Sequence, residues 1–290
     1  LVKATFASGF VKNKILEFVG PGIANLSMDY RIGIDVMTTE TTCLSSVWET
    51  DEKTHEYLAE HGREGDYTEM KIAGPAYYDG AVTIDLSRVE PMIALPFHPS
   101  NAYTIREFLA DPLPILEKVQ EQGRKIKGDD SFTLTDKVRD GKVYVTQGII
   151  AGCAGGGYEN VAEATEILRG KSVGTGEFAL SVYPASQPVY KALTDAGYTS
   201  ALMESGAVVK TAFCGPCFGS GDVPANNGLS IRHTTRNFEN REGSKPTQGQ
   251  LAAVALMDAR SIAATAANGG VLTSALDWEY NKRIKKYKYD

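Results

Sequence analysis

The strongest constraint on the fold of this chain is a regular alternation of apolar runs with helical patterns in its second half. Runs at 143–150, 178–182 and 207–213 have the length and side chains of buried strands. Between them lie one helical pattern that stops at Gly170 and another that Pro188 opens. Strands that alternate with helices form a parallel sheet covered by helices on both faces. The sequence therefore predicts an α/β fold with mainly parallel sheets.

Further patterns complete the expected secondary structure. Residues 229–235 read as another strand, and the alanine-rich stretch 251–268 reads as one helix. In the first half, residues 82–86 alternate like a half-buried strand. Ser27 and Thr50 are the expected N-caps of two helices there.

Length and composition indicate two domains of an ordinary globular protein. The chain has 290 residues, and the polar stretch 128–131 is the expected linker, which gives domains at 1–128 and 129–290. The net charge of −6 argues against a general nucleic-acid binder. No apolar run approaches the roughly 20 residues that span a membrane. Four cysteines are too few for a disulfide scaffold and predict a reducing compartment, the cytoplasm.

Three of the cysteines stand where a strand-like run gives way to glycine. Cys153 follows the run that ends at Ile150, and Cys214-Gly-Pro-Cys217 follows the run 207–213. Parallel sheets bind their ligands off the carboxyl ends of the strands. These thiols are therefore expected to gather at one edge of the sheet.

The Cys214-Gly-Pro-Cys217 motif alone leaves several readings open. It serves thiol–disulfide exchange, forms half of a zinc site, or is simply two free thiols. Zinc needs a fourth Cys or His, and no histidine lies at zinc spacing from the pair. Three thiolates from two loops suit a 4Fe–4S cluster with one open iron, which would act as a Lewis acid.

Two other signals accompany the cysteines. Arg236 and Arg241 follow the strand-like run 229–235, and arginine grips carboxylates with two parallel hydrogen bonds. Taken alone, such a pair is more often a solvated surface feature. Glu40 stands in a threonine-rich stretch that resembles a lined pocket, although most glutamates in such stretches are simply exposed. Cys43 has no partner in sequence and is expected to be a small buried thiol.

Several separated motifs follow one another along residues 1 to about 275. They are Glu17-Phe-Val-Gly-Pro-Gly22, Ile84-Asp-Leu-Ser87 with Glu90-Pro91, Gly152-Cys153 with Tyr158-Glu159, Cys214-Gly-Pro-Cys217, and Arg236-Asn-Phe238 with Arg241. At these motifs the chain resembles the aconitase superfamily, the 4Fe–4S hydro-lyases that include aconitase and isopropylmalate isomerase. It is most similar to the aconitase-like hydratases of bacteria.

The resemblance implies a fold, a cofactor and a set of roles. The fold is two consecutive three-layer α/β/α domains, and the activity is that of a hydro-lyase on a small hydroxy di- or tricarboxylic acid. Cys153, Cys214 and Cys217 match the cluster ligands. Arg236 and Arg241 match the arginines that bind substrate carboxylates, and Glu40 matches an active-site glutamate.

The chain also departs from the family pattern. Gly152-Cys-Ala-Gly-Gly-Gly157 replaces Ser-Cys-Thr-Asn-Ser, which removes side-chain hydrogen bonds near the cluster. Threonine at 235 and valine at 36 replace two asparagines. These departures put citrate in particular in question as the substrate.

The family's first domain and its swivelling last domain, which carries the serine base, are expected to lie outside this chain. The chain is therefore expected to be a fragment, inactive alone, from which the cluster can be absent. Two alternatives remain at this point: a thiol–disulfide oxidoreductase that uses Cys214 and Cys217, and a non-enzymatic cluster-sensing or RNA-binding relative of aconitase.

Overall fold

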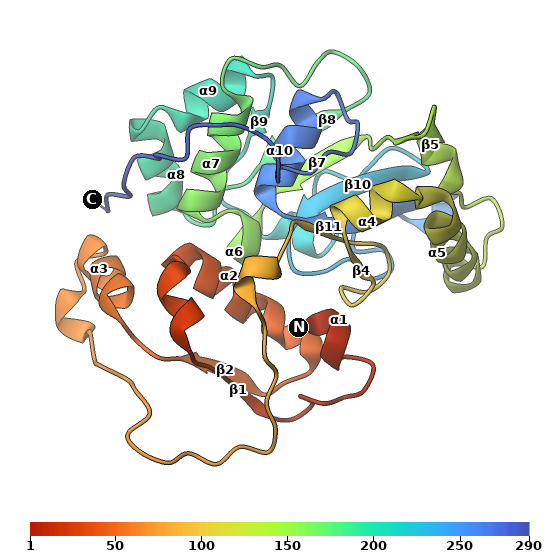
Figure 1. Ribbon diagram of the computed structural model, residues 1–290. Coiled ribbons are helices and arrows are strands. Elements are labelled where there is room, and N and C mark those ends of the chain that lie inside the picture. Colours follow the sequence, from red (N-terminus) through yellow and green to blue (C-terminus); the bar gives the residue numbers. More distant parts are fainter. Residues whose placement is uncertain (290) are drawn as a thin grey trace. The chain divides into compact units, whose positions relative to one another are not determined.

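The computed structural model describes residues 1–289 and divides into two compact units (Figure 1). The first unit comprises residues 1–89 together with the C-terminal residues from 286, and the second comprises 90–285. The boundary expected between 128 and 129 falls inside the second unit, and the assignment of family domains at that boundary stays a prediction. Among residues 1–289, no helix is both long and apolar enough to cross a bilayer.

The first unit is built on a strand–helix–strand motif. Its elements are α1 (Val2–Thr5), β1 (Ile15–Phe18), α2 (Met28–Thr38), β2 (Ser45–Trp48) and α3 (Glu52–Glu60), with 3-10 turns at Pro21–Asn25, Thr39–Thr41, Glu64–Asp66 and Leu86–Arg88. β1 and β2 pair in parallel, with Ile15 opposite Ser45. Asp35 of α2 accepts hydrogen bonds from Trp48 Nε1 at 2.7 Å and Ser46 Oγ at 2.6 Å, which fastens the helix to β2.

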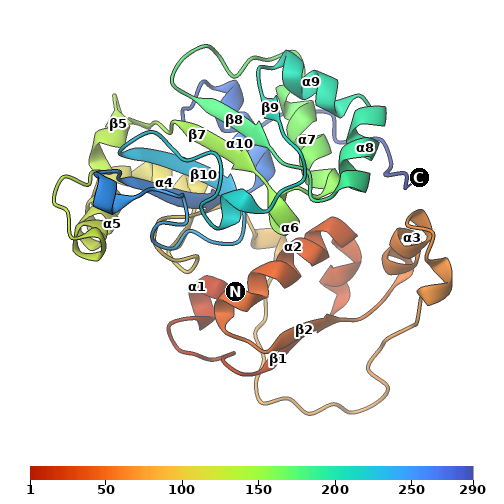
Figure 2. The same ribbon diagram turned by 180° about the vertical axis from the view of Figure 1, so that it is seen from behind.

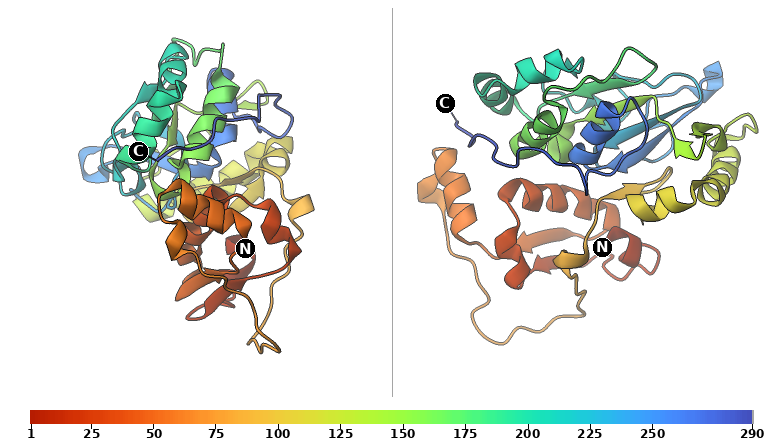
Figure 3. Two further views of the ribbon diagram at one scale, coloured as in Figure 1. Left: turned by 90° about the vertical axis from the view of Figure 1, so that its left-hand side faces the viewer. Right: turned by 45° about the horizontal axis from the view of Figure 1, so that its top comes forward.

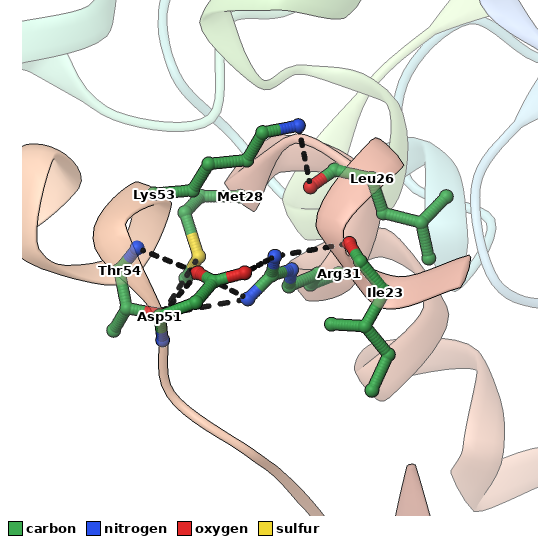
Figure 4. Close-up of polar contacts among 7 residues, drawn as sticks. All are labelled: Ile23, Leu26, Met28, Arg31, Asp51, Lys53 and Thr54. Carbon is green, nitrogen blue, oxygen red and sulfur yellow. Dashed lines mark hydrogen bonds and ion pairs between the residues drawn. The ribbon is translucent and has the colours of Figure 1, made fainter. Parts of the chain in front are cut away.

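An ion pair between a buried arginine and a partly exposed aspartate joins α2 to the start of α3 (Figure 4). Arg31 is 2% exposed and donates from both terminal nitrogens to Asp51, at 2.6 and 3.0 Å. Asp51 also caps α3 by accepting from Thr54 N–H at 3.2 Å. The hydrogen bonds from Arg31 hold the pKa of Asp51 below its usual range. The expected cap at Thr50 is therefore wrong by one residue, whereas Ser27 caps α2 as expected.

Residues 67–85 run as an exposed loop without helix or strand, visible in Figure 3 as the light orange trace of the first unit. The strand expected at 82–86 is therefore wrong. No neighbouring strand is available to pair with these residues among those described. Asp85 instead caps the turn Leu86–Arg88 by accepting from Ser87 N–H at 3.0 Å.

The second unit is organised around a seven-stranded sheet, counted within the described residues, in the order β4-β3-β11-β10-β7-β8-β9. The strands are β3 (Met92–Ala94), β4 (Ala102–Thr104), β7 (Gln147–Ile150), β8 (Ala179–Val182), β9 (Val208–Val209), β10 (Gly228–His233) and β11 (Ala252–Met257). From β11 to β9 all pairs are parallel, and β3 and β4 add an antiparallel edge. A small hairpin of β5 (Val138–Arg139) and β6 (Lys142–Val143) stands apart from this sheet.

Helices surround the parallel strands, so the prediction of an α/β fold with a mainly parallel sheet is confirmed. They are α4 (Ile105–Ala110), α5 (Pro112–Lys127), α6 (Gly152–Gly155), α7 (Tyr158–Leu168), α8 (Gln187–Asp195), α9 (Tyr198–Glu204) and α10 (Ala259–Ala267), with 3-10 turns at Thr135–Lys137, Gly215–Cys217 and Pro246–Gln248. α10 packs against α7 and against β7 and β10, as Figure 2 shows from behind the sheet. At Gly148 of β7 there is no room for a side chain beneath Ile262 of α10, because an added Cβ would lie 2.9 Å from it.

The alanine-rich stretch 251–268 is not a single helix. Its first part is β11, whose six residues are all buried between β10 and β3, and its second part is α10. Asp258 divides the two by capping α10 through Ser261 N–H at 3.0 Å. Burial in the centre of the sheet outweighs the helix propensity of alanine here.

Candidate functional site

The order of the parallel strands has a switch point between β7 and β10. The chain runs outward from β7 through β8 to β9 and then returns to β10, on the other side of β7. In open α/β sheets, ligands bind beyond the carboxyl ends of the strands at such a point. Cys153 lies just after β7, and the segment containing Arg236 follows β10.

Cys153 lies in α6, a single helical turn that begins directly after β7. Gly152 adopts a φ of +70°, which favours glycine, and lets the chain turn from extended Ala151 into this helix. Ala151 N–H donates to the carbonyl of His233 at 3.2 Å, so the ends of β7 and β10 are held together. Cys153 itself is exposed.

Cys214 and Cys217 lie at the two ends of a tight turn. The turn Gly215–Cys217 is a 3-10 helix, labelled η6 below, that Cys217 N–H closes by donating to Cys214 O at 3.1 Å. Cys214 is exposed and Cys217 is half-buried. Cys217 Sγ lies 3.1 Å from the hydroxyl of Thr235, which follows β10, so this turn also meets the end of that strand.

The three thiols lie close enough to influence one another. α6 and η6 are in contact. Cys153 is exposed as a residue, but the protein around its thiol removes part of the solvent and so raises its pKa, and the neighbouring Cys217 raises it further. Burial likewise raises the pKa of Cys214, with added contributions from Cys217 and Cys153. Arg236 acts in the opposite direction on both thiols. The structure thus brings together four of the six predicted site residues.

The three thiols are a donor set of the kind that binds an iron–sulfur cluster. Among residues 1–289, no three His, Cys, Asp or Glu side chains converge so as to hold one metal ion. In an iron–sulfur cluster, the thiolates are instead distributed around the cluster rather than around one point. All three cysteines are free, and the raised pKa values of Cys153 and Cys214 mean that a bound cation would promote the deprotonation of these two thiols. The donor set therefore fits a cluster.

The surroundings of Cys214 differ from those of the attacking cysteine in a disulfide-exchange pair. In disulfide exchange the attacking cysteine of such a pair has a lowered pKa, because the thiolate is the nucleophile. Here mutual repulsion and burial act in the other direction. The turn also leads into irregular chain, with no α-helix whose N-terminus would stabilise a thiolate.

The arginine segment, residues 236–241, is fastened to the antiparallel edge of the sheet. Asn237, which is 1% exposed, donates from Nδ2 to the carbonyl oxygens of Leu95 at 2.7 Å and Ala94 at 3.1 Å. Arg241 is half-buried and closes a turn by donating its N–H to Phe238 O at 3.1 Å. The next residue, Glu242, is buried and lies in an ion pair considered in the Discussion.

Glu40 belongs to the first unit, in the turn Thr39–Thr41, and is 6% exposed. Its Oε1 accepts from the hydroxyl of Thr39 at 3.4 Å. The structure gives it a buried polar setting, and its meeting with the cysteines stays a prediction. Cys43 is half-buried rather than buried, with its thiol 3.3 Å from Thr38 O.

Sequence reasoning missed a polar network that surrounds the cysteine turn. Its central residue is Arg232 of β10, which is 0% exposed. Its other members are Gln147, Tyr183, Lys210, Asp222 and Ser230. The available signal was a charged residue inside the strand-like run 229–235, because a charged side chain is rarely buried in a strand unless it has polar partners.

His233, next to Arg232, gives a prediction about pH. Its Nδ1 accepts from Ala259 N–H at 3.1 Å, and burial lowers its pKa to about 4. Below the ordinary pKa of 6.5 the unfolded chain takes up a proton that the folded chain does not. The contribution of His233 to the free energy of unfolding is therefore complete above pH 6.5, and it should fall by about 3 kcal/mol as the pH drops to 4. Urea unfolding of the wild type and of His233→Gln isolates this contribution, because glutamine keeps an acceptor but does not titrate. If the free energy of unfolding depended on pH equally in both proteins, the prediction would be wrong.

Comparison with protein families gives one match, to the model of the aconitase family (aconitate hydratase), over residues 1–264. The 3-isopropylmalate dehydratase large subunit of Caldicellulosiruptor bescii is 30% identical over 250 residues, which are 86% of this chain and 51% of that protein. The 2,3-dimethylmalate dehydratase large subunit of Eubacterium barkeri is 31% identical over 248 residues, 85% of this chain and 51% of that protein.

A third relative covers more of the chain. The 3-isopropylmalate dehydratase large subunit 2 of Rubrobacter xylanophilus is 33% identical over 275 residues, 94% of this chain and 56% of that protein. The chain therefore spans about half the length of the curated relatives it matches.

Proposed function

The chain belongs to the aconitase family, and from this we propose that it is part of an iron–sulfur hydro-lyase. Cys153, Cys214 and Cys217 would hold a 4Fe–4S cluster that leaves one iron open. The observation that supports this most is the gathering of three free thiols beside the strand-order switch point. When bound, the cluster would supply a Lewis acid that polarises the hydroxyl group to be lost as water.

The substrate we propose is a small hydroxy di- or tricarboxylic acid. Arg236 and Arg241 would each grip a carboxylate through paired hydrogen bonds. The charge of Arg236 already acts on two of the thiols, which supports its placement beside the reacting group. The relatives carry the names of isopropylmalate and dimethylmalate dehydratases, which are enzymes of branched malates. A substrate of that class is in keeping with the departures of this chain from the aconitase pattern.

The chain's own residues would orient the substrate and not complete the reaction. The hydroxyl group of Thr235 would donate a hydrogen bond to Cys217 Sγ. Hydrogen bonds of this kind adjust the reduction potential of a cluster. Glu40 would join a polar network beside the substrate. The base that removes the proton is proposed to come from further polypeptide, since the relatives are named large subunits. A reducing compartment such as the cytoplasm would keep the four cysteines free.

Anaerobic reconstitution with iron and sulfide tests this proposal. The wild-type chain should turn brown, absorb broadly in the visible range and give an electron-resonance signal on mild oxidation. Cys153→Ser, Cys214→Ser and Cys217→Ser should each lose most of the signal, because a cluster held by three thiolates cannot spare one. Cys43→Ser is the matched control and should keep it. A wild-type chain without absorbance, or equal loss in the Cys43 variant, would refute the assignment.

A further inference from the structure

A completely buried arginine lies directly beneath the cysteine turn. Arg232, on the central strand β10, is 0% exposed. Its Nη1 donates to the carbonyl of Pro216 at 2.6 Å, and its Nη2 donates to the carbonyl of Asp222 at 3.1 Å. Pro216 lies between Cys214 and Cys217. The guanidinium therefore links the turn that carries both cysteines to Asp222, six residues after Pro216.

The contacts of Arg232 are with neutral oxygens. Besides the two carbonyls, Nε donates to Ser230 Oγ at 3.0 Å and Nη2 donates to Gln147 Oε1 at 3.3 Å. Burial of a cation without a carboxylate in direct contact is unfavourable. Burial accordingly lowers the pKa of Arg232 to about 10. A residue retained at such a cost in a sheet core suggests a role other than stability.

The supporting side chains hold the guanidinium in one orientation. Ser230 Oγ donates to Gln147 Oε1 at 2.6 Å, and Gln147 Nε2 donates to the same Asp222 carbonyl at 2.9 Å. Ser230 and Gln147 are paired in register on β10 and β7, so both project from one face of the sheet. This face is opposite the one that carries Gly148 and α10.

The far end of the loop has a second attachment. Asp222 accepts from Lys210 Nζ at 2.5 Å and from Tyr183 OH at 2.7 Å. Tyr183 follows β8 and Lys210 follows β9. Asp222 itself has a φ of +47°, which is uncommon for aspartate. The two hydrogen bonds to its carboxylate and the two to its carbonyl offset that strain. Strands β7 to β10 thus all contribute to holding the segment 216–222.

We propose that Arg232 is a positioning residue that fixes the turn of Cys214 and Cys217 by binding the carbonyl groups of Pro216 and Asp222. Only the identity of the ligand that these thiols take rests on the proposed function. Glutamine or methionine cannot bridge two carbonyls with charged donors, and lysine presents one ammonium rather than a planar fork. The turn should therefore open when Arg232 is replaced.

Alkylation of the iron-free protein with iodoacetamide, followed cysteine by cysteine by mass spectrometry, tests the proposal without any cluster. In Arg232→Met the alkylation of the half-buried Cys217 should be about tenfold faster, because the lost bonds to a charged donor stabilise the closed turn by at least 1.4 kcal/mol. Arg232→Lys should give an intermediate increase of about threefold. Cys43, in the other unit, should react at the same rate in every variant.

Arg260→Met is the matched control. Arg260 is 8% exposed and bonded to Glu163 and to Asn160 Oδ1 at 3.1 Å, so its loss disturbs the same unit of the protein. It should lower the unfolding temperature and leave the ratio of Cys217 to Cys43 alkylation unchanged. An unchanged ratio in a folded Arg232→Met protein would overturn the proposal, as would an equal rise in Arg260→Met.

Two further arms complete the test. If Arg232→Met does not fold, Ser230→Ala decides, since it removes the two hydrogen bonds of Ser230 Oγ, to Arg232 Nε and to Gln147 Oε1. A rise of about twofold in the alkylation rate of Cys217 alone supports the proposal, and no rise overturns it. After reconstitution, Arg232→Lys should bind a cluster with an altered electron-resonance signal. A wild-type chain that binds no cluster would refute the proposed function while leaving the alkylation result valid.

Discussion

Glu242→Gln is expected to destabilise the second unit by about 3–5 kcal/mol, because it leaves a buried ammonium group without its carboxylate. Lys127, at the end of α5, and Glu242 are 0% and 2% exposed in their side chains, with Nζ 3.5 Å from Oε1. Lys127 Nζ lies 5.8 Å and 5.6 Å from the ring centroids of Phe97 and Phe132, so water does not replace the lost partner. The free energy of unfolding in urea measures the effect.

A double-mutant cycle separates the pair from the rest of the fold. Lys127→Met combined with Glu242→Gln removes both charges and should recover most of the loss. Lys191→Met is the surface control, because Lys191 and Asp195 are more than half exposed and such pairs contribute less than about 1 kcal/mol. A loss of that small size in Glu242→Gln would mean that the pair does not anchor the segment after Arg241.

Gly155→Ala is expected to displace the helical turn that carries Cys153. An added Cβ would lie 2.2 Å from the backbone oxygen of His233 and 2.8 Å from its Cβ, so the backbone of α6 or of β10 must move. Overpacking of this kind costs about 1–3 kcal/mol and here falls on a site element. We expect a lower unfolding temperature and faster alkylation of Cys153.

Gly176→Ala provides the comparison for this steric effect. Gly176 lies in the same unit, and no atom lies within 4 Å of an added Cβ. Its replacement should leave the unfolding temperature and the alkylation rate of Cys153 unchanged. A wild-type rate at Cys153 in Gly155→Ala would show that α6 tolerates the extra methyl group.

These glycines revise one interpretation made from sequence. The stretch Gly152-Cys-Ala-Gly-Gly-Gly157 was expected to lack hydrogen bonds that the family supplies. In the structure, Gly155 and Gly156 allow β10 and the end of β8 to approach α6 closely, since an added Cβ at Gly156 would lie 2.4 Å from Tyr183 O. The small residues of this stretch thus allow close contact between backbone segments.

The sequence predicted the elements whose signals are local. The strands at 179–182 and 228–233 follow from short runs with alternating apolar residues, and the cap at Ser27 follows from a hydroxyl before a helix. The sequence also predicted that Cys153 and the Cys214 pair would share one edge of the sheet. That expectation needed only the rule that parallel strands end on the same side.

The errors arose where distant residues decide the outcome. Residues 252–257 became a strand because β10 and β3 lie on either side of them, which an alanine-rich sequence does not reveal. Residues 82–86 alternate correctly and yet find no strand to pair with in the described part of the chain. Arg232 was passed over because its importance depends on a turn sixteen residues earlier in the chain.

The return of the chain from β9 to β10 has a consequence for maturation. β8 and β9 separate Cys153 from the pair at 214 and 217 along the chain, and the turn of that pair is held by Arg232 of β10, on the other side of β7. Such non-local pairing is completed late in folding. Iron would then enter a finished scaffold, in contrast to zinc fingers, in which the metal drives folding.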